Sequence, residues 1–279
     1  MQIGALDVAI LTEGSMRIDG GSVFGPVPRV LWEKRLPPDE KNRVQIGLHQ
    51  LLVKGPEFNL LIDTGVGTKV SPKYKTIYGI DCKQDWNQRL KPFGLTPAEI
   101  THVIFTHLHF DHAGGATCFS DDSSEVFPTF PNAKHFAQEG EWRDACSPNE
   151  RTRRQYQFEN FLPLQNEGKL QLISGDHEIV EGVRVQVTGG HTRFHQMVII
   201  GTGATRLFVP GDLCPTSQHL GVSWQMAFDL FPLDSLQARK SFLSKVLGTG
   251  HLVYFNHDPE ARFVRITGDA EHPEATPAG

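Results

Sequence analysis

A dense group of histidines, placed directly after an apolar run, constrains this chain more than any other feature. The apolar run spans residues 102–106 and leads into the segment His107-Leu108-His109-Phe110-Asp111-His112. The whole chain holds 13 histidines in 279 residues, so composition alone does not explain three of them within six positions. In an extended chain the side chains of His107 and His109 point the same way. The glycines that follow let the backbone turn, so that Asp111 and His112 reach the same place.

Four nitrogen or oxygen donors at one strand end indicate a metal site. Imidazole and carboxylate groups without thiolates suit a borderline cation such as zinc, although manganese, cobalt and iron accept the same ligands. Four ligands from one turn, together with partners from elsewhere, exceed what a single tetrahedral ion needs, so we expect two adjacent divalent ions per chain. The partners are expected at the ends of other strands, where three residues fit: His191, Asp212 and His257.

The apolar patterning predicts two sheets with helices outside them. Strands are expected at residues 4–11, 44–53, 58–62, 102–106, 170–173, 183–187, 197–200, 207–209 and 252–255, the first three as antiparallel neighbours. Helices are expected near residues 96–99, within 139–162, and from Asp234 or Ser235 to a stop at Gly248. This order favours a layered α+β fold in one domain, residues 1–279, with residues 267–279 as a flexible tail.

Composition argues against several classes of partner. The 27 basic and 32 acidic residues give a formal charge of −5, whereas binding to a nucleic-acid backbone needs a basic surplus. No stretch approaches the roughly 18 apolar residues of a membrane-spanning helix. The four cysteines form no CxxC pair, which favours a reducing, cytoplasmic location. We therefore expect neither a nucleic-acid nor a membrane partner.

The complete order of candidate ligands, HxHxDH followed by His, Asp and His, resembles that of metallo-β-lactamase-fold hydrolases. The resemblance implies an αββα sandwich of two mixed β-sheets with helices on the outer faces. It also implies a ligand set for each metal, with Asp212 bridging the two ions: His107, His109 and His191 for one, and Asp111, His112 and His257 for the other. Asp63, which follows the strand at 58–62, either starts a turn or orients a ligand histidine.

Flanking segments resemble the quorum-quenching N-acyl-homoserine lactonases, in particular the YtnP-like branch. The similar segments are residues 19–28, 94–97, 226–229 and 232–235. The resemblance implies that a metal-bridging hydroxide opens the ring of an N-acyl-homoserine lactone or a related lactone, and that Asp111 passes a proton to the leaving alkoxide. The best-known relatives have a tyrosine three residues after the bridging aspartate, where this chain has Pro215. A homodimer built partly from residues 20–32 is expected by the same likeness.

An acyl chain needs an apolar wall, and five side chains near the ligands could supply it or could simply pack in the core: Phe24, Phe110, Trp224, Met226 and Phe228. Two other hydrolases share the fold and stay open as alternatives, an organophosphate or arylester hydrolase of the methyl parathion hydrolase type and a glyoxalase II-like thioesterase. The second is weakened because no helical region follows His257. A non-catalytic metal- or ligand-binding module is the alternative from another class.

Overall fold

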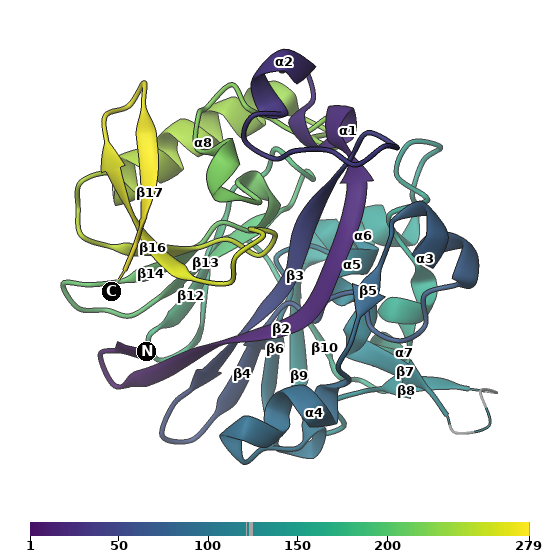
Figure 1. The fold of residues 1–279 in the computed structure, drawn as a ribbon. Coiled ribbons are helices and arrows are strands. Elements are labelled where there is room, and N and C mark those ends of the chain that lie inside the picture. The colour runs from purple at the N-terminus through teal and green to yellow at the C-terminus, as the bar shows by residue number, and fades with distance from the viewer. Residues whose placement is uncertain (121, 123–124, 279) are drawn as a thin grey trace.

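Two β-sheets carry the fold of the computed structural model, which describes residues 1–120, 122 and 125–278 (Figure 1). The first sheet has the order β1-β2-β3-β4-β6-β9-β10, with β5 added beside β2. Its strands are β1 (Gln2–Ile3), β2 (Leu6–Asp19), β3 (Arg43–Lys54), β4 (Asn59–Ile62), β5 (Asp81–Cys82), β6 (His102–Ile104), β9 (Lys134–Gln138) and β10 (Leu170–Ile173). Strands β1 to β4 pair antiparallel, as predicted for residues 4–62, whereas β4, β6, β9 and β10 run parallel.

The second sheet follows the chain order from β11 to β17. Its strands are β11 (His177–Val180), β12 (Val183–Val187), β13 (Gln196–Ile200), β14 (Leu207–Val209), β15 (Leu252–Tyr254), β16 (Phe263–Gly268) and β17 (Pro273–Pro277). The prediction of a flexible tail over residues 267–279 is wrong, because β17 pairs antiparallel with β16 at the edge of this sheet. A separate hairpin joins β7 (Thr117–Phe119) to β8 (Val126–Pro128).

Short helices lie on the outer faces, and the longest is α8 (Pro232–Val246). The others are α1 (Gly20–Phe24), α2 (Arg29–Trp32), α3 (Pro72–Ile77), α4 (Trp86–Leu90), α5 (Phe110–Ala113), α6 (Glu139–Cys146) and α7 (Leu162–Asn166). The predicted start of α8 at Asp234 or Ser235 is wrong, because the helix begins at Pro232, whose fixed φ suits a first helical residue. The predicted helix at 96–99 is one 3₁₀ turn, Pro97–Glu99, with the expected capping box. Within the described residues, no helix has the length and apolar character needed to cross a bilayer.

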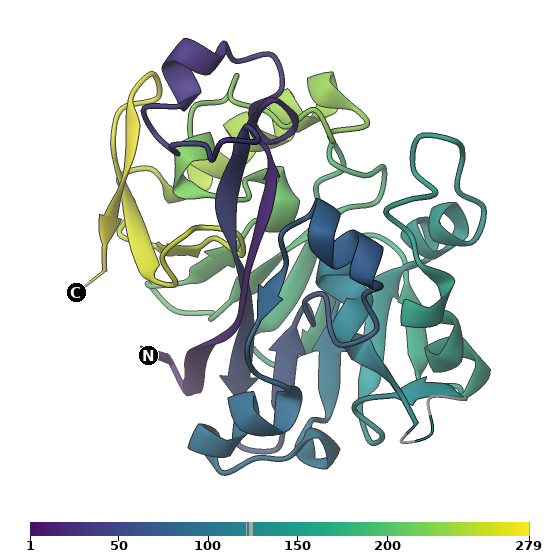
Figure 2. The same ribbon diagram turned by 45° about the vertical axis from the view of Figure 1, so that its right-hand side comes forward.

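Three of the four apolar clusters hold the layers of the sandwich together. Side chains such as Val8, Ile62 and Val198 fill the space between the sheets. Helices α4, α6 and α7 cover the outer face of the first sheet through a second cluster, and α8 covers the second sheet through a third. This arrangement confirms the predicted αββα sandwich of two mixed sheets. In the turned view of Figure 2, the C-terminal hairpin still lies at the outer edge, on the same side as the N-terminus.

Parallel pairing explains why the candidate ligands meet. Strands β4 and β6 run parallel, so the residues that follow them, Asp63 and His107, leave the first sheet at the same edge. Strands β14 and β15 run parallel in the second sheet, which brings Asp212 and His257 to one edge. Because the sheets face each other, the two edges meet at one end of the sandwich.

Candidate metal centre

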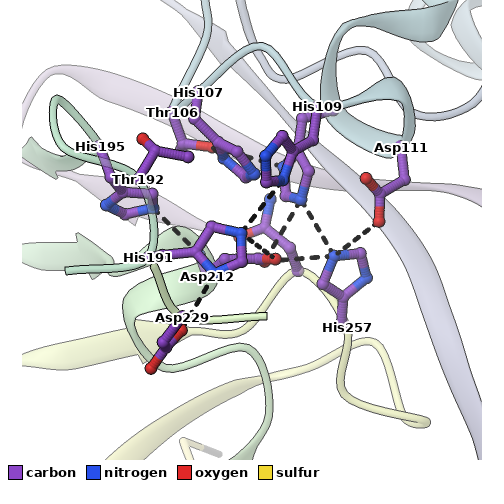
Figure 3. A network of polar contacts seen from close by, with 12 residues as sticks. Thr106, His107, His109, Asp111, His191, Thr192, His195, Asp212, Asp229 and His257 are labelled. Atoms are coloured by element: carbon purple, nitrogen blue, oxygen red, sulfur yellow. Dashed lines mark hydrogen bonds and ion pairs between the residues drawn. The ribbon is translucent and has the colours of Figure 1, made fainter. Parts of the chain in front are cut away.

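Seven polar side chains from both sheets converge at this end of the sandwich, and Figure 3 labels all of them except His112. The loop after β6 and the first turn of α5 carry four of them, and the loops after β12, β14 and β15 carry one each: His107, His109, Asp111, His112, His191, Asp212 and His257. All are buried except Asp111, which is partly exposed. The predicted ligands therefore come together in the structure.

Ring nitrogens of different histidines lie within hydrogen-bond distance of one another at this centre. Nε2 of His191 lies 3.1 Å from Nδ1 of His109, and Nε2 of His257 lies 3.1 Å from Nε2 of His112. Candidate ligand atoms fall into three overlapping groups in which all atoms lie within 4.8 Å of one another. The groups are His107, His109 and His191; His107, His112 and Asp212; and Asp111, His112 and His257. Two of these groups coincide with the sets that the family resemblance implies.

Asp212 lies between the two groups of histidines (Figure 3). Its Oδ2 is 3.4 Å from Nε2 of His191, whereas its Oδ1 is 3.2 Å from Nε2 of His112 and 3.3 Å from Nε2 of His257. Burial disfavours the charged carboxylate, but the surrounding imidazoles outweigh burial and hold the pKa of Asp212 well below its usual range. One carboxylate thus presents a different oxygen to each group.

The donor set fits divalent cations. Nε2 of His107 and Nε2 of His109 are buried and have no hydrogen-bond partner among the described residues. Burial lowers the pKa of both histidines well below the usual range, so each imidazole is neutral with a lone pair to share. Burial also disfavours the charged form of His112, yet Asp212, Asp63 and Asp111 outweigh it and raise the pKa of that imidazole. A cation bound at the same place would compete with that proton.

A further set of contacts fixes the orientation of the histidines. His112 donates from Nδ1 to Oδ2 of Asp63 at 2.9 Å, and His257 donates from Nδ1 to the carbonyl oxygen of Gly47 at 2.8 Å. His191 donates from Nδ1 to Oδ1 of Asp229 at 3.1 Å. With Nδ1 occupied in this way, the Nε2 atom of each ring faces the centre. Asp63 also has a positive φ of 57°, so it both forms the turn after β4 and contacts a histidine.

Comparison with known proteins decides the family. A model of the metallo-beta-lactamase superfamily matches residues 49–257, a range that covers more than half of the chain and holds the seven converging side chains. The chain belongs to the metallo-beta-lactamase superfamily. The resemblance drawn from the HxHxDH segment is therefore confirmed.

Relatives within the superfamily include proteins named as lactonases. An N-acyl homoserine lactonase of Bacillus cereus is 30% identical over 174 residues, and the aligned region covers 61% of this chain and 61% of that protein. The chain thus spans less than two thirds of the length of this relative. The N-acyl homoserine lactonase AttM of Rhizobium johnstonii is 23% identical over 237 residues, which cover 75% of this chain and 81% of that protein.

Solved structures agree with the fold over the whole chain. A probable metal-dependent hydrolase from Staphylococcus aureus is 30% identical with a TM-score of 0.89, covering 99% of this chain and 98% of the other. AidC, a dizinc quorum-quenching lactonase solved with the product N-hexanoyl-L-homoserine, is 20% identical with a TM-score of 0.80, and the match covers 100% of this chain and 96% of that one. At that identity, AidC supports the shared fold alone.

A cavity lies beside the seven converging side chains, and five of them line it. Only part of the predicted apolar wall lines the same cavity. Phe110, Met226 and Phe228 contact the cavity, together with Asp111 and Pro215. Two other predicted side chains, Phe24 and Trp224, are not among the residues that line it. Phe24 is fully buried, with its ring centroid 5.4 Å from that of Trp32 and 5.0 Å from that of His219. Trp224 meets the edge of Phe24 at 5.8 Å and stacks with the Arg35 guanidinium at 3.6 Å.

Two acidic residues that contact the ligand loops were not among the predicted site residues. Asp229 lies in one of the segments similar to the lactonases, but its contact with His191 depends on how that loop folds back. Glu141 lies on α6, in a polar segment expected to be a surface helix, yet it is only 1% exposed. It accepts hydrogen bonds from the Leu108 amide at 3.1 Å, the Tyr156 hydroxyl at 2.9 Å and the Thr192 hydroxyl at 2.6 Å. Its spacing from the histidines gives no local signal for this role.

Proposed function

We propose that this protein is a dinuclear-metal hydrolase that opens the lactone ring of N-acyl-homoserine lactones. The observation that carries the proposal is the pair of ligand groups joined by Asp212, at the base of a cavity with an apolar wall. The relatives named N-acyl homoserine lactonase support this choice of substrate. Lactone opening needs an activated water, a group that returns a proton to the ring oxygen, and space for an acyl chain.

The ligands are divided between two sites in this proposal. His107, His109 and His191 hold one divalent ion, and the second group consists of Asp111, His112 and His257. Asp212 serves both, since its two oxygens face different histidines. When bound, two divalent ions supply hydroxide at neutral pH and polarise a carbonyl group. Zinc is the proposed metal, because the donors are imidazoles and carboxylates without a thiolate.

Asp111 is the proposed proton carrier. Its Oδ2 lies 3.8 Å from Nε2 of His257, and its side chain lines the cavity with 12% of its surface exposed, so it can reach both the centre and a bound substrate. Hydroxide attacks the lactone carbonyl carbon, the bond from that carbon to the ring oxygen breaks, and the ring oxygen leaves as an alkoxide. Asp111 takes the proton of the attacking hydroxide and gives it to the alkoxide, which leaves a carboxylate and an alcohol.

The apolar wall sets where the acyl chain lies. Phe110 is adjacent to Asp111, and Met226 and Phe228 line the same cavity from the loop before α8. In this proposal the acyl chain contacts these three side chains and the lactone ring lies beside the ligand groups that line the same cavity. We therefore expect the affinity for the substrate to rise with acyl-chain length until this wall is filled.

The test is a proton-release assay on zinc-loaded protein with a hexanoyl- and a decanoyl-homoserine lactone, followed by mass analysis of the product. Ring-opened acyl-homoserine, lost after chelation and restored by zinc, is the expected result. A nitrophenyl ester, a thioester and a phosphotriester are assayed beside them. Protein shown to hold two metal ions that hydrolyses one of these but leaves both lactones intact would refute the lactonase proposal.

A further inference from the structure

The cavity contains few polar side chains beyond the proposed metal ligands, and most of their hydrogen-bonding groups are already occupied. Thr216 and His219 line it, but the Thr216 hydroxyl lies 2.7 Å from Nδ1 of His219. Nε2 of His219 donates to the carbonyl oxygen of Val23 at 3.0 Å. Pro215 offers no donor at all. These residues have no hydrogen-bond donor left for a substrate.

Tyr78 is different, because it lines the cavity and its hydroxyl has no hydrogen-bond partner among the described residues. The residue follows the last turn of α3, and two backbone hydrogen bonds hold it there. Its amide donates to the carbonyl oxygen of Tyr74 at 2.9 Å, and its carbonyl oxygen accepts from the amide of Arg17 at 2.6 Å. The centroid of its ring lies 5.3 Å from that of Phe110 and 5.5 Å from that of Tyr74. The phenol is therefore held in place by its ring while its polar end stays free.

The surroundings keep this phenol protonated. Tyr78 is half-buried, and burial together with the nearby Tyr74 and Asp111 raises its pKa above the usual value. At neutral pH the side chain is a hydrogen-bond donor close to the proposed proton carrier. A substrate oxygen that gains negative charge beside Asp111 needs such a donor, since the carboxylate itself only accepts.

We propose that the Tyr78 hydroxyl donates a hydrogen bond to the carbonyl oxygen of the substrate and stabilises that oxygen as it becomes negatively charged. The inference rests on the proposed function, because it assigns a contact in the same reaction. Gln155 is the other cavity residue whose side-chain amide is uncommitted among the described residues, but it lies in a wall shared with a second cavity. Tyr78 is favoured because its ring is fixed against Phe110, next to Asp111.

The experiment compares Tyr78→Phe with Tyr74→Phe. Both remove one hydroxyl from the same pair of packed rings, but the Tyr74 hydroxyl donates to the carbonyl of Arg154 and does not line the cavity. For Tyr78→Phe we expect kcat to fall about 100-fold with little change in KM, as is typical when an oxyanion donor is lost. We expect the dissociation constant of the ring-opened acyl-homoserine, measured by calorimetry on zinc-loaded protein, to rise about tenfold.

The outcomes separate this inference from the proposed function. A wild-type protein that opens lactones and a Tyr78→Phe variant with unchanged kcat and product affinity would refute the role of Tyr78 alone. An equal loss of kcat in Tyr74→Phe would assign the effect to the packing of the two rings. A loss of kcat confined to Gln155→Leu would assign the contact with the substrate to Gln155. Either result overturns the inference. A wild-type protein inert towards lactones would refute the proposed function first. Zinc content, measured for every variant, shows whether the ligand cluster is intact.

Discussion

Removing the carboxylate of Glu141 is expected to loosen the two loops that carry three of the candidate ligands. Leu108 lies between His107 and His109, and Thr192 follows His191, so Glu141 joins these loops through hydrogen bonds. Burial raises the pKa of Glu141, whereas the three hydrogen-bond donors favour its carboxylate form. We therefore assign each hydrogen bond a free energy at the low end of the range for a charged acceptor. At roughly 1.5 kcal/mol for each of three bonds, Glu141→Ala should lower the free energy of unfolding by about 4.5 kcal/mol.

The assay is urea unfolding of chelated protein, followed by zinc titration of the folded state. Glu141→Gln keeps an oxygen for Leu108 and Tyr156, so we expect it to cost only about 1.5 kcal/mol. We expect the zinc affinity of Glu141→Ala to fall about tenfold or more, as happens when groups that orient ligands are lost. Glu139→Ala, which changes an exposed residue of the same helix, is the matched control. If Glu141→Ala unfolds within about 1 kcal/mol of the wild type and binds zinc equally well, the reasoning is wrong.

Three further predictions test the site and the core. Asp111→Asn should lower kcat by about 10²- to 10⁴-fold on lactones, because the amide cannot carry the proton; zinc-loaded variant with wild-type turnover would contradict this. Chelation should lower the free energy of unfolding by about 4 kcal/mol, if the reference is protein with free zinc at about 1,000 times its dissociation constant. Thermal unfolding with and without chelator would show this difference. His135 has both ring nitrogens buried without a partner among the described residues, and burial lowers its pKa to about 3. Below pH 6.5 the unfolded chain takes up a proton at His135 that the folded chain does not, so this one residue should lower the free energy of unfolding by about 2 kcal/mol at pH 5 relative to pH 7.5. His135→Leu should therefore make the loss of stability between pH 7.5 and pH 5 smaller by about that amount than in the wild type, as urea unfolding at the two pH values would show, whereas changing the exposed His177 in the same way should leave it unchanged.

The candidate ligands could be proposed from the sequence because they lie in the segments that follow strands with a clear apolar pattern. Strands β12 and β14 have the predicted bounds, and their following loops deliver His191 and Asp212 to the centre. Nearness to the ligands in sequence predicts less well which apolar side chains line the cavity. Met226 and Phe228 line the cavity, but Trp224 in the same loop turns away to pack on Phe24. Which face of an irregular loop points inward depends on tertiary contacts that the sequence pattern does not contain.

The end of the chain shows the same limit for secondary structure. The segment Pro273–Pro277 begins and ends with proline and has no apolar alternation, so its sequence favours a tail. It becomes β17 because the edge of β16 offers a row of unpaired backbone groups, and Arg265 and Thr276 lie opposite each other in that ladder. Pairing at an available edge decides this strand, and local propensity has little influence there.

The candidate metal centre also joins the two sheets through polar contacts. Asp63 of the first sheet accepts from the Asn256 side chain of the second at 3.1 Å, and the β3 carbonyl of Gly47 accepts from His257. Each proposed ligand group also mixes residues from the two sheets, as His107 and His191 do in one of them. Metal ions bound to these groups would therefore link the two sheets, and chelation should loosen the end of the sandwich before it affects the apolar layer around Val8 and Val198. Hydrogen exchange of the β6 and β14 amides, compared with those of β2 and β13, would reveal that order of opening.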